Sequence, residues 1–186
     1  MGQVGNVVTK GLLDKREYYY RAVYMDCIRA LDFAERCSEI DKTKLIVRGT
    51  SQGGALAMAV SSLDLRPALA IANVPSNSNI EKRVIGHYGS FGAVSDYLKR
   101  YPYEAERVFH TLSYFDIMNM AEAVRCPVFA SVALEDEVCP AACYYAAYNR
   151  IPGEKEMMVY PFNGHDGAGN LHMEHEMEYV KRKGLL

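Results

Sequence analysis

The feature that most constrains the fold is a set of short, continuous apolar runs separated by segments with helical spacing. Strands that are buried on both faces of a sheet read as continuous apolar runs, whereas strands with one exposed face alternate. Four such runs occur, at residues 45–47, 68–74, 128–134 and 156–161. Helix-like stretches fall at 51–63, 141–149 and 174–183. This order predicts an α/β fold with a parallel sheet of about four strands flanked by helices.

A long amphipathic helix is expected ahead of the first run, over residues 16–37. Its apolar positions recur among alanines and charged residues, at Tyr20, Val23, Ile28, Leu31 and Phe33. The segment 81–124 contains several glycines and tyrosines and is interpreted as an insertion between two strands. Its tyrosines suit a lid or a subunit contact, or else they cover a core. With 186 residues and no linker or repeat, the chain is expected to form a single domain, 1–186.

The overall composition excludes several functional classes. Hydrophobic residues make up 49% of the chain and charged residues 24%, and the net charge is −2. This balance gives no electrostatic reason to expect a nucleic acid or a membrane surface as partner. No apolar run approaches the roughly 20 residues that span a bilayer, and the N-terminus lacks the features of a signal peptide. We therefore expect a cytoplasmic protein.

The cysteines do not indicate a metal site. Their number is odd and their spacing is not that of a zinc site, at Cys27, Cys37, Cys126, Cys139 and Cys143. Reduced, mostly buried thiols are expected. Cys139 and Cys143 would come close together if Pro140 opens a helix, but no histidine at ligand spacing joins them. We therefore expect no metal and no other cofactor.

Ser51 is the candidate nucleophile. It lies within residues 49–54, Gly-Thr-Ser-Gln-Gly-Gly, directly between the first apolar run and a helix. Gly49 and Gly53 are expected to keep side chains away from a tight turn in which Ser51 takes an uncommon backbone conformation. The N-terminus of the following helix favours negative charge that develops there. The alternative is a Gly/Ser-rich loop that carries no chemistry.

Two further residues follow later strands, in the order that α/β-hydrolases use for their acid and base. Asp136 comes just after the third run, and His165 comes in a glycine-containing loop after the fourth. The neighbouring carboxylates Glu135 and Glu137 compete with Asp136, because any of the three could be a solvated loop charge or a helix cap. The other histidines compete with His165, at His87, His110, His172 and His175. Asp166 is expected to fix the loop rather than to act as the acid.

An oxyanion hole is expected at the backbone N–H of Gln52, the residue after the nucleophile. In this fold the second donor comes from a loop after an early strand, and this sequence shows no early strand.

Several stretches resemble the acetyl xylan esterase and cephalosporin C deacetylase family of carbohydrate esterases. The resemblance covers nearly the whole chain and is carried by residues 9–15, 18–26, 49–54, 111–116, 134–136, 146–149 and 164–165. It implies Ser51 as nucleophile, Asp136 as acid and His165 as base. It also implies deacetylation of small acetylated sugars and a hexameric ring.

The sequence departs from the family in two respects. His165 is followed by Asp166 where the family usually has Glu. The family's N-terminal portion, with its early strands and the tyrosine that completes the oxyanion hole, is absent from this sequence. We therefore expect the C-terminal part of an α/β-hydrolase fold, with an open sheet edge at the first strand. Self-association, or a rearranged N-terminal segment, is expected to bury this edge.

The leading hypothesis is a serine esterase that hydrolyses short acyl, chiefly acetyl, esters of small saccharides, with activity weakened if one oxyanion donor is lost. One alternative is a weakly active or inactive family member that serves as an assembly or binding module. Another is a serine peptidase of the same fold, against which the family-specific stretches argue.

Overall fold

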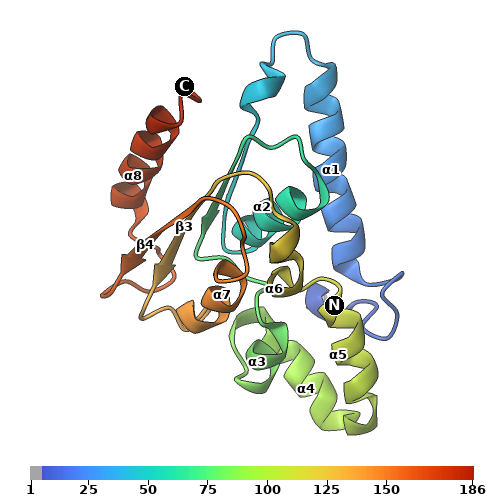
Figure 1. Ribbon diagram of the computed structural model, residues 1–186. Coiled ribbons are helices and arrows are strands. Elements are labelled where there is room, and N and C mark those ends of the chain that lie inside the picture. Colours follow the sequence, from blue (N-terminus) through green and yellow to red (C-terminus); the bar gives the residue numbers. More distant parts are fainter. Residues whose placement is uncertain (1–5) are drawn as a thin grey trace, which may run out of the picture.

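A parallel sheet of four strands forms the centre of the computed structural model, which describes residues 6–186 (Figure 1). The strands lie in the order β1-β2-β3-β4, and each neighbouring pair is parallel. Their bounds are Ile46–Thr50, Leu69–Asn73, Val128–Ala133 and Lys155–Tyr160. The four predicted runs thus form the four strands, which confirms the predicted α/β class and the flanked parallel sheet.

Helices cover both faces of this sheet (Figure 1). One face carries α8, and the other carries α1 and α2. α7 follows β3. The bounds of α1, α2, α7 and α8 are Tyr19–Arg36, Gln52–Leu63, Ala141–Tyr148 and Gly169–Arg182. α8 begins five residues earlier than predicted.

Alternate residues of β2 divide the core between the two faces. Ala70 and Ala72 belong to the larger cluster, which includes side chains of α1 and α2. Leu69 and Ile71 belong to a smaller cluster, with Tyr179 of α8. Because successive side chains of a strand point to opposite faces, the fully buried strand β2 contributes side chains to the core on both faces of the sheet.

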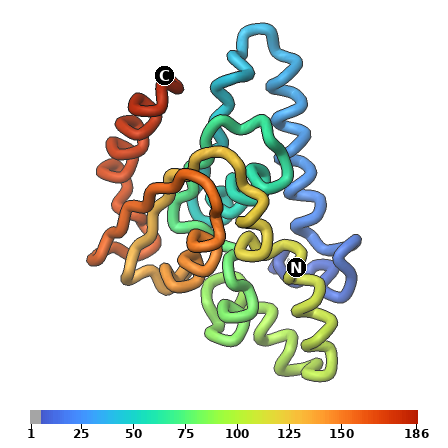
Figure 2. The backbone as a smooth tube through the Cα atoms, viewed as in Figure 1, coloured from blue at the N-terminus to red at the C-terminus, as the bar shows by residue number. Residues whose placement is uncertain are grey.

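The segment predicted as an insertion forms helices between β2 and β3. In Figure 2 it is the green-to-yellow part of the tube at the bottom of the view, far from α8 in red. Helices α3 to α6 span Ile80–Ile85, Gly92–Arg100, Ala105–Ser113 and Ile117–Met120. Phe91, Val108 and Ile117 are fully buried in the larger core. Tyr101 and Tyr103 are exposed, so apolar side chains rather than these tyrosines close the core.

The prediction that the first strand is buried on both faces is wrong. β1 alternates between half-buried and exposed residues, with Arg48 and Thr50 exposed. Among the strands described it pairs with β2 alone, so it lies at an edge of the sheet. The short 3-10 helix Val7–Thr9 packs against α1 and α4.

Helix α1 departs from the expected apolar face at one position. Tyr20, Tyr24 and Leu31 are buried, but the Phe33 side chain is 72% exposed. Phe33 follows Leu31 by only two residues, which places it about 200° around a helix from that side chain. Phe33 therefore lies on the solvent side of α1.

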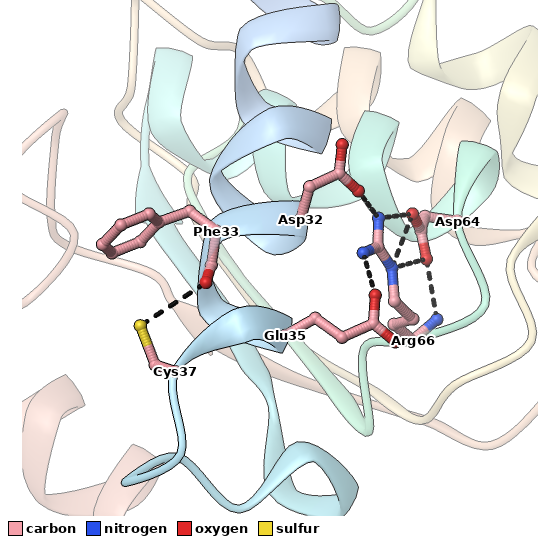
Figure 3. A network of polar contacts seen from close by, with 6 residues as sticks. All are labelled: Asp32, Phe33, Glu35, Cys37, Asp64 and Arg66. Atoms are coloured by element: carbon pink, nitrogen blue, oxygen red, sulfur yellow. Dashed lines mark hydrogen bonds and ion pairs between the residues drawn. The ribbon is translucent and has the colours of Figure 1, made fainter.

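Arg66, between α2 and β2, contacts three carboxylates, two of which belong to the C-terminal part of α1 (Figure 3). Its guanidinium contacts Asp32 at 2.8 Å and Glu35 at 2.9 Å, both from α1, and Asp64 at 2.5 Å. The network joins the C-terminal part of α1 to the connection that leads into β2.

The sequence predicts reduced cysteines and no membrane-spanning segment, and both predictions can be checked in the described residues. All five cysteines are free, and Cys139 and Cys143 are buried. No helix within residues 6–186 is both long and apolar enough to cross a membrane.

Candidate active site

Ser51 occupies a strained turn between β1 and α2. Its φ of 57° is unusual for a residue with a side chain, and such backbone conformations cost of order 1–3 kcal/mol unless their surroundings fix them. Here the N–H of Ser51 donates to the carbonyl of Asn73 at 2.8 Å. The carbonyl of Ser51 accepts from the N–H groups of Ala55 and Ser76 at 3.1 and 3.0 Å. Three backbone hydrogen bonds therefore fix the turn.

The glycines around Ser51 differ in what they provide. A Cβ on Gly49 would lie 2.2 Å from the backbone carbon of Gly53, so only glycine fits at position 49. A Cβ on Gly54 would lie 2.9 Å from the carbonyl oxygen of Asn73, where α2 approaches β2. A Cβ on Gly53 would meet nothing within 4 Å. The expectation that Gly53 must be glycine for steric reasons is therefore wrong, and Gly54 has that requirement instead.

His165 links Ser51 to a carboxylate. It lies in the loop between β4 and α8, and its Nε2 is 3.0 Å from Ser51 Oγ. Its Nδ1 is 2.8 Å from Asp136 Oδ2. The side chain of His165 is one-third exposed, whereas that of Asp136 is completely buried. The imidazole thus bridges a half-buried serine and a carboxylate shielded from solvent.

Asp136 is the only one of the three neighbouring carboxylates that is buried, since Glu135 and Glu137 are exposed. Its Oδ1 accepts from the backbone N–H groups of Val138 at 2.8 Å and Cys139 at 2.7 Å. These bonds hold the turn that leads from β3 into α7, and they leave Oδ2 directed at His165. Both carboxylate oxygens therefore have defined partners.

Asp166 stabilises the loop that carries His165. It accepts hydrogen bonds from the side chain of Asn163 at 2.9 Å and from the backbone of Gly164 at 3.0 Å and Ala168 at 3.2 Å. The bond from Asn163 lowers the pKa of this exposed carboxyl. The hydrogen bonds of Asp166 thus stay within its own loop, while the Asp136 carboxylate contacts the imidazole.

Gln52 is the first residue of α2, and the first N–H groups of a helix have no carbonyl partner within it. The Gln52 side chain donates to Tyr20 Oη at 3.1 Å. A cavity of about 240 Å³ opens at this place, and Ser51, Gln52 and Tyr20 form part of its lining. A larger cavity of about 620 Å³ lies along α1 and has none of Ser51, Asp136 and His165 in its lining.

Cys139 is a neighbour that the sequence did not indicate. Its Sγ is 3.9 Å from Ser51 Oγ, and burial raises the pKa of the thiol. Among the described residues, Asp136, Cys139 and His165 could offer ligand atoms to a metal ion, within 4.8 Å of one another. A protonated thiol is a poor metal ligand and both oxygens of Asp136 have hydrogen-bond partners, so the arrangement fits proton transfer from Ser51 to His165 better than a metal ion. The position of Cys139, three residues after Asp136 and two before α7, is the one signal that could have placed it here.

The other histidines lie elsewhere. His172 is buried under the sheet, where its Nε2 is 2.6 Å from Asn73 Oδ1 and its Nδ1 is 2.9 Å from Tyr160 Oη. His87 pairs with Asp96 on the surface. Of the five histidines, His165 is the one that hydrogen-bonds Ser51.

Comparison with models of protein families matches residues 2–183 to "Acetyl xylan esterase (AXE1)". The chain belongs to the acetyl xylan esterase (AXE1) family. The family resemblance seen in the sequence is thereby confirmed, and with it the assignment to the α/β-hydrolase fold.

Two solved acetyl xylan esterases have the same fold. The enzyme from Paenibacillus sp. R4 is 38% identical with a TM-score of 0.92, over 98% of this chain and 58% of that one. Acetyl xylan esterase 1 from Thermoanaerobacterium sp. JW/SL YS485 is 29% identical with a TM-score of 0.83, over 96% and 59%. The acetyl esterase Axe7A of Xylanibacter ruminicola is 33% identical over 162 residues, which are 85% of this chain and 35% of Axe7A. The chain thus spans somewhat more than half of the two solved relatives.

Proposed function

We propose that this chain is a serine esterase that removes short acyl groups, chiefly acetyl, from small acetylated saccharides through an acyl-enzyme. The observation that carries the proposal is the continuous hydrogen-bonded chain of Ser51, His165 and Asp136 in a member of the acetyl xylan esterase (AXE1) family. A serine hydroxyl becomes a good nucleophile when a base takes its proton and a carboxylate stabilises the imidazolium that forms.

In the proposed mechanism His165 Nε2 accepts the proton of Ser51 as Oγ attacks the acetyl carbonyl. Asp136 holds the Nδ1–H side of the ring and stabilises its positive charge. The backbone N–H of Gln52 is the proposed donor to the oxyanion. His165 then protonates the leaving alcohol, and the same imidazole activates the water that releases acetate from Ser51.

The cavity beside Ser51 supports a short acyl group and a polar alcohol. Its volume of about 240 Å³ lies below the range of about 300–1,000 Å³ that is usual for ligand pockets. Hydroxyl and amide side chains dominate its polar lining, at Tyr20, Gln52, Ser76 and Ser90. Such groups exchange hydrogen bonds readily with the hydroxyls of a sugar.

The test measures hydrolysis of p-nitrophenyl acetate, butyrate and octanoate and of acetylated xylo-oligosaccharides. Each substrate is given to the wild type, to Ser51→Ala and to Ser62→Ala. Ser62 is the matched control, because its hydroxyl is bonded to the Met58 carbonyl within α2. We expect acetate to be preferred, Ser51→Ala to lose activity and Ser62→Ala to keep it. Equal rates for the wild type and Ser51→Ala would remove Ser51 from the mechanism.

Labelling with a fluorophosphonate probe separates catalysis from a binding or assembly role. An activated Ser51 reacts with the probe, whereas a member without a working site does not. Peptide hydrolysis without a preference for esters would favour a peptidase instead.

We also propose that the chain self-associates. The support is the position of β1, which pairs on one side only among the described strands, because unpaired edges promote association. A monodisperse monomer in sedimentation velocity would contradict this proposal.

A further inference from the structure

Arg83 of α3 is a buried cation with an incomplete set of partners. The residue is 1% exposed. Its Nη2 donates to the carbonyl of Val138 at 2.8 Å, and its guanidinium carbon lies 5.2 Å from the centre of the Phe91 ring. Its Nε and Nη1 are buried and have no hydrogen-bond partner among the described residues.

The charge of Arg83 is not neutralised by a carboxylate of the described chain. No Asp or Glu oxygen within residues 6–186 forms an ion pair with it, and residues 1–5 contain no acidic side chain. A guanidinium stays protonated in proteins, and burying an unpaired charge is costly. The nearby Cys139 thiol does not offset it, because burial raises the pKa of that thiol more than the charge of Arg83 lowers it. Unsatisfied buried polar groups are rare in folded proteins, so these call for a ligand.

The position of Arg83 in the cavity beside Ser51 indicates the chemical class of the ligand. Arg83 forms part of the wall of the cavity beside Ser51, and among the described residues it is the only charged one in that lining. The carbonyl that holds Arg83 belongs to Val138, in the turn that Asp136 also holds. An anionic group on a molecule that presents its ester to Ser51 would therefore lie close to an unpaired positive charge, among hydroxyl and amide side chains.

We propose that Arg83 is a specificity-determining residue that selects acetyl esters whose alcohol part carries a carboxylate, such as acetylated sugar acids. The inference rests on the esterase function proposed above. A guanidinium recognises a carboxylate through charge-assisted hydrogen bonds, and two of the three nitrogens of Arg83 have no hydrogen-bond partner among residues 6–186. Neutral acetyl esters lack this interaction and bind through the polar lining alone.

The test compares two esters that differ in one charge, 4-acetoxybenzoate and its methyl ester. The quantity measured is the ratio of kcat/KM for the anionic ester to kcat/KM for the neutral ester. We expect Arg83→Met to lower this ratio by at least about tenfold, chiefly through KM, because hydrogen bonds to charged groups are worth that much or more. Arg83→Lys keeps the charge but not the guanidinium geometry, and it is expected to retain part of the preference.

Lys82→Met is the matched control, since it removes the same charge from the neighbouring, exposed position of α3. It is expected to leave the ratio unchanged. A ratio that Arg83→Met leaves unchanged while both esters slow equally would overturn the proposal and assign Arg83 a structural role. Labelling of Ser51 in Arg83→Met by the fluorophosphonate probe shows that the site is still formed.

If the wild type hydrolyses neither ester and is not labelled, the proposed esterase function fails separately. The role of Arg83 is then decided by calorimetric titration with 4-hydroxybenzoate. Weaker binding to Arg83→Met than to Lys82→Met would support an anion site, and equal binding would overturn it.

Discussion

Asn73 joins the turn at Ser51 to the opposite face of the sheet. Its backbone carbonyl accepts the N–H of Ser51 at 2.8 Å, while its buried side chain bonds His172 and Glu176 of α8. Arg48 completes this group with two hydrogen bonds to the Glu176 carboxylate, the shorter at 2.6 Å. The conformation of the proposed nucleophile is thus linked to the packing of α8 through a single residue of β2.

Asp136→Asn should abolish most esterase activity while the protein stays folded. An amide at this position favours the wrong tautomer of His165, and the equivalent change in a serine protease lowers kcat by about 10⁴. The measurement is kcat for p-nitrophenyl acetate, with circular dichroism as the check on folding.

Asp166→Asn is the control for Asp136→Asn, because it changes the carboxylate next to His165 in sequence. Its hydrogen bonds lie within an exposed loop, and surface changes of this kind are usually within about 0.5 kcal/mol. Comparable losses in the two variants would contradict the assignment of Asp136 as the acid.

Gly49→Ala should destabilise the protein and inactivate it. The added Cβ would meet backbone atoms of Gly53 at 2.2 Å, and overpacking of this kind costs about 1–3 kcal/mol or more. The measurements are the free energy of unfolding in urea and the rate of fluorophosphonate labelling.

Gly53→Ala serves as the paired substitution, because its Cβ enters open space in the first turn of α2. Alanine is favoured over glycine in helices by up to about 1 kcal/mol, so stability should stay the same or rise. If both alanine variants lose activity equally, steric restraint at Gly49 is not what shapes the turn.

Stability should fall as the pH drops below about 6.5, the usual pKa of a histidine. Burial lowers the pKa of His172 in the folded protein, partly opposed by the Glu176 carboxylate, with His175 and Arg48 acting in the same direction as burial. Between the lowered pKa and 6.5 the unfolded chain binds a proton that the folded protein does not, which favours unfolding.

Urea unfolding of the wild type and His172→Gln at pH 7.5 and 5.5 measures this contribution. His172→Gln should lose less stability between the two pH values than the wild type does. Parallel losses in both proteins would show that other groups cause the pH dependence.

Arg66→Met should lower Tm by a few degrees, because it leaves Asp32, Glu35 and Asp64 without their shared cation. Esterase activity at 25 °C should persist, since this network is remote from Ser51. Arg29→Met is the control, as Arg29 forms one exposed pair with Asp26 at 3.5 Å and such isolated pairs contribute little. Equal Tm values for the two variants would show that the network adds nothing beyond an isolated pair.

The sequence predicted the strands well, and it placed Ser51, Asp136 and His165 correctly at the ends of β1, β3 and β4. Continuous apolar runs predict the strands, and the chain order of this fold predicts where the three residues follow them.

The start of α8 was missed because Gly169 and Asn170 resemble a loop in sequence. The open edge at β1 was predicted, but the apolar residues 45–47 suggested burial on both faces, so the partial exposure of the strand was missed. The approach of Arg83 to Ser51 depends on how the insertion packs, and no local pattern indicates it, whereas the place of Cys139 three residues after Asp136 was a signal that went unused.

The sheet order has a consequence for how activity can be lost. Among the described strands, Ser51 follows the strand at one edge and His165 lies in the loop that follows the strand at the other, so their hydrogen bond joins loops from the two edges of the sheet. A slip of one residue in either edge strand would displace one partner by about 3.3 Å, more than a hydrogen bond tolerates. The proposed esterase activity therefore depends on the register of both edge strands, and it should disappear before secondary structure does as the protein is gently denatured.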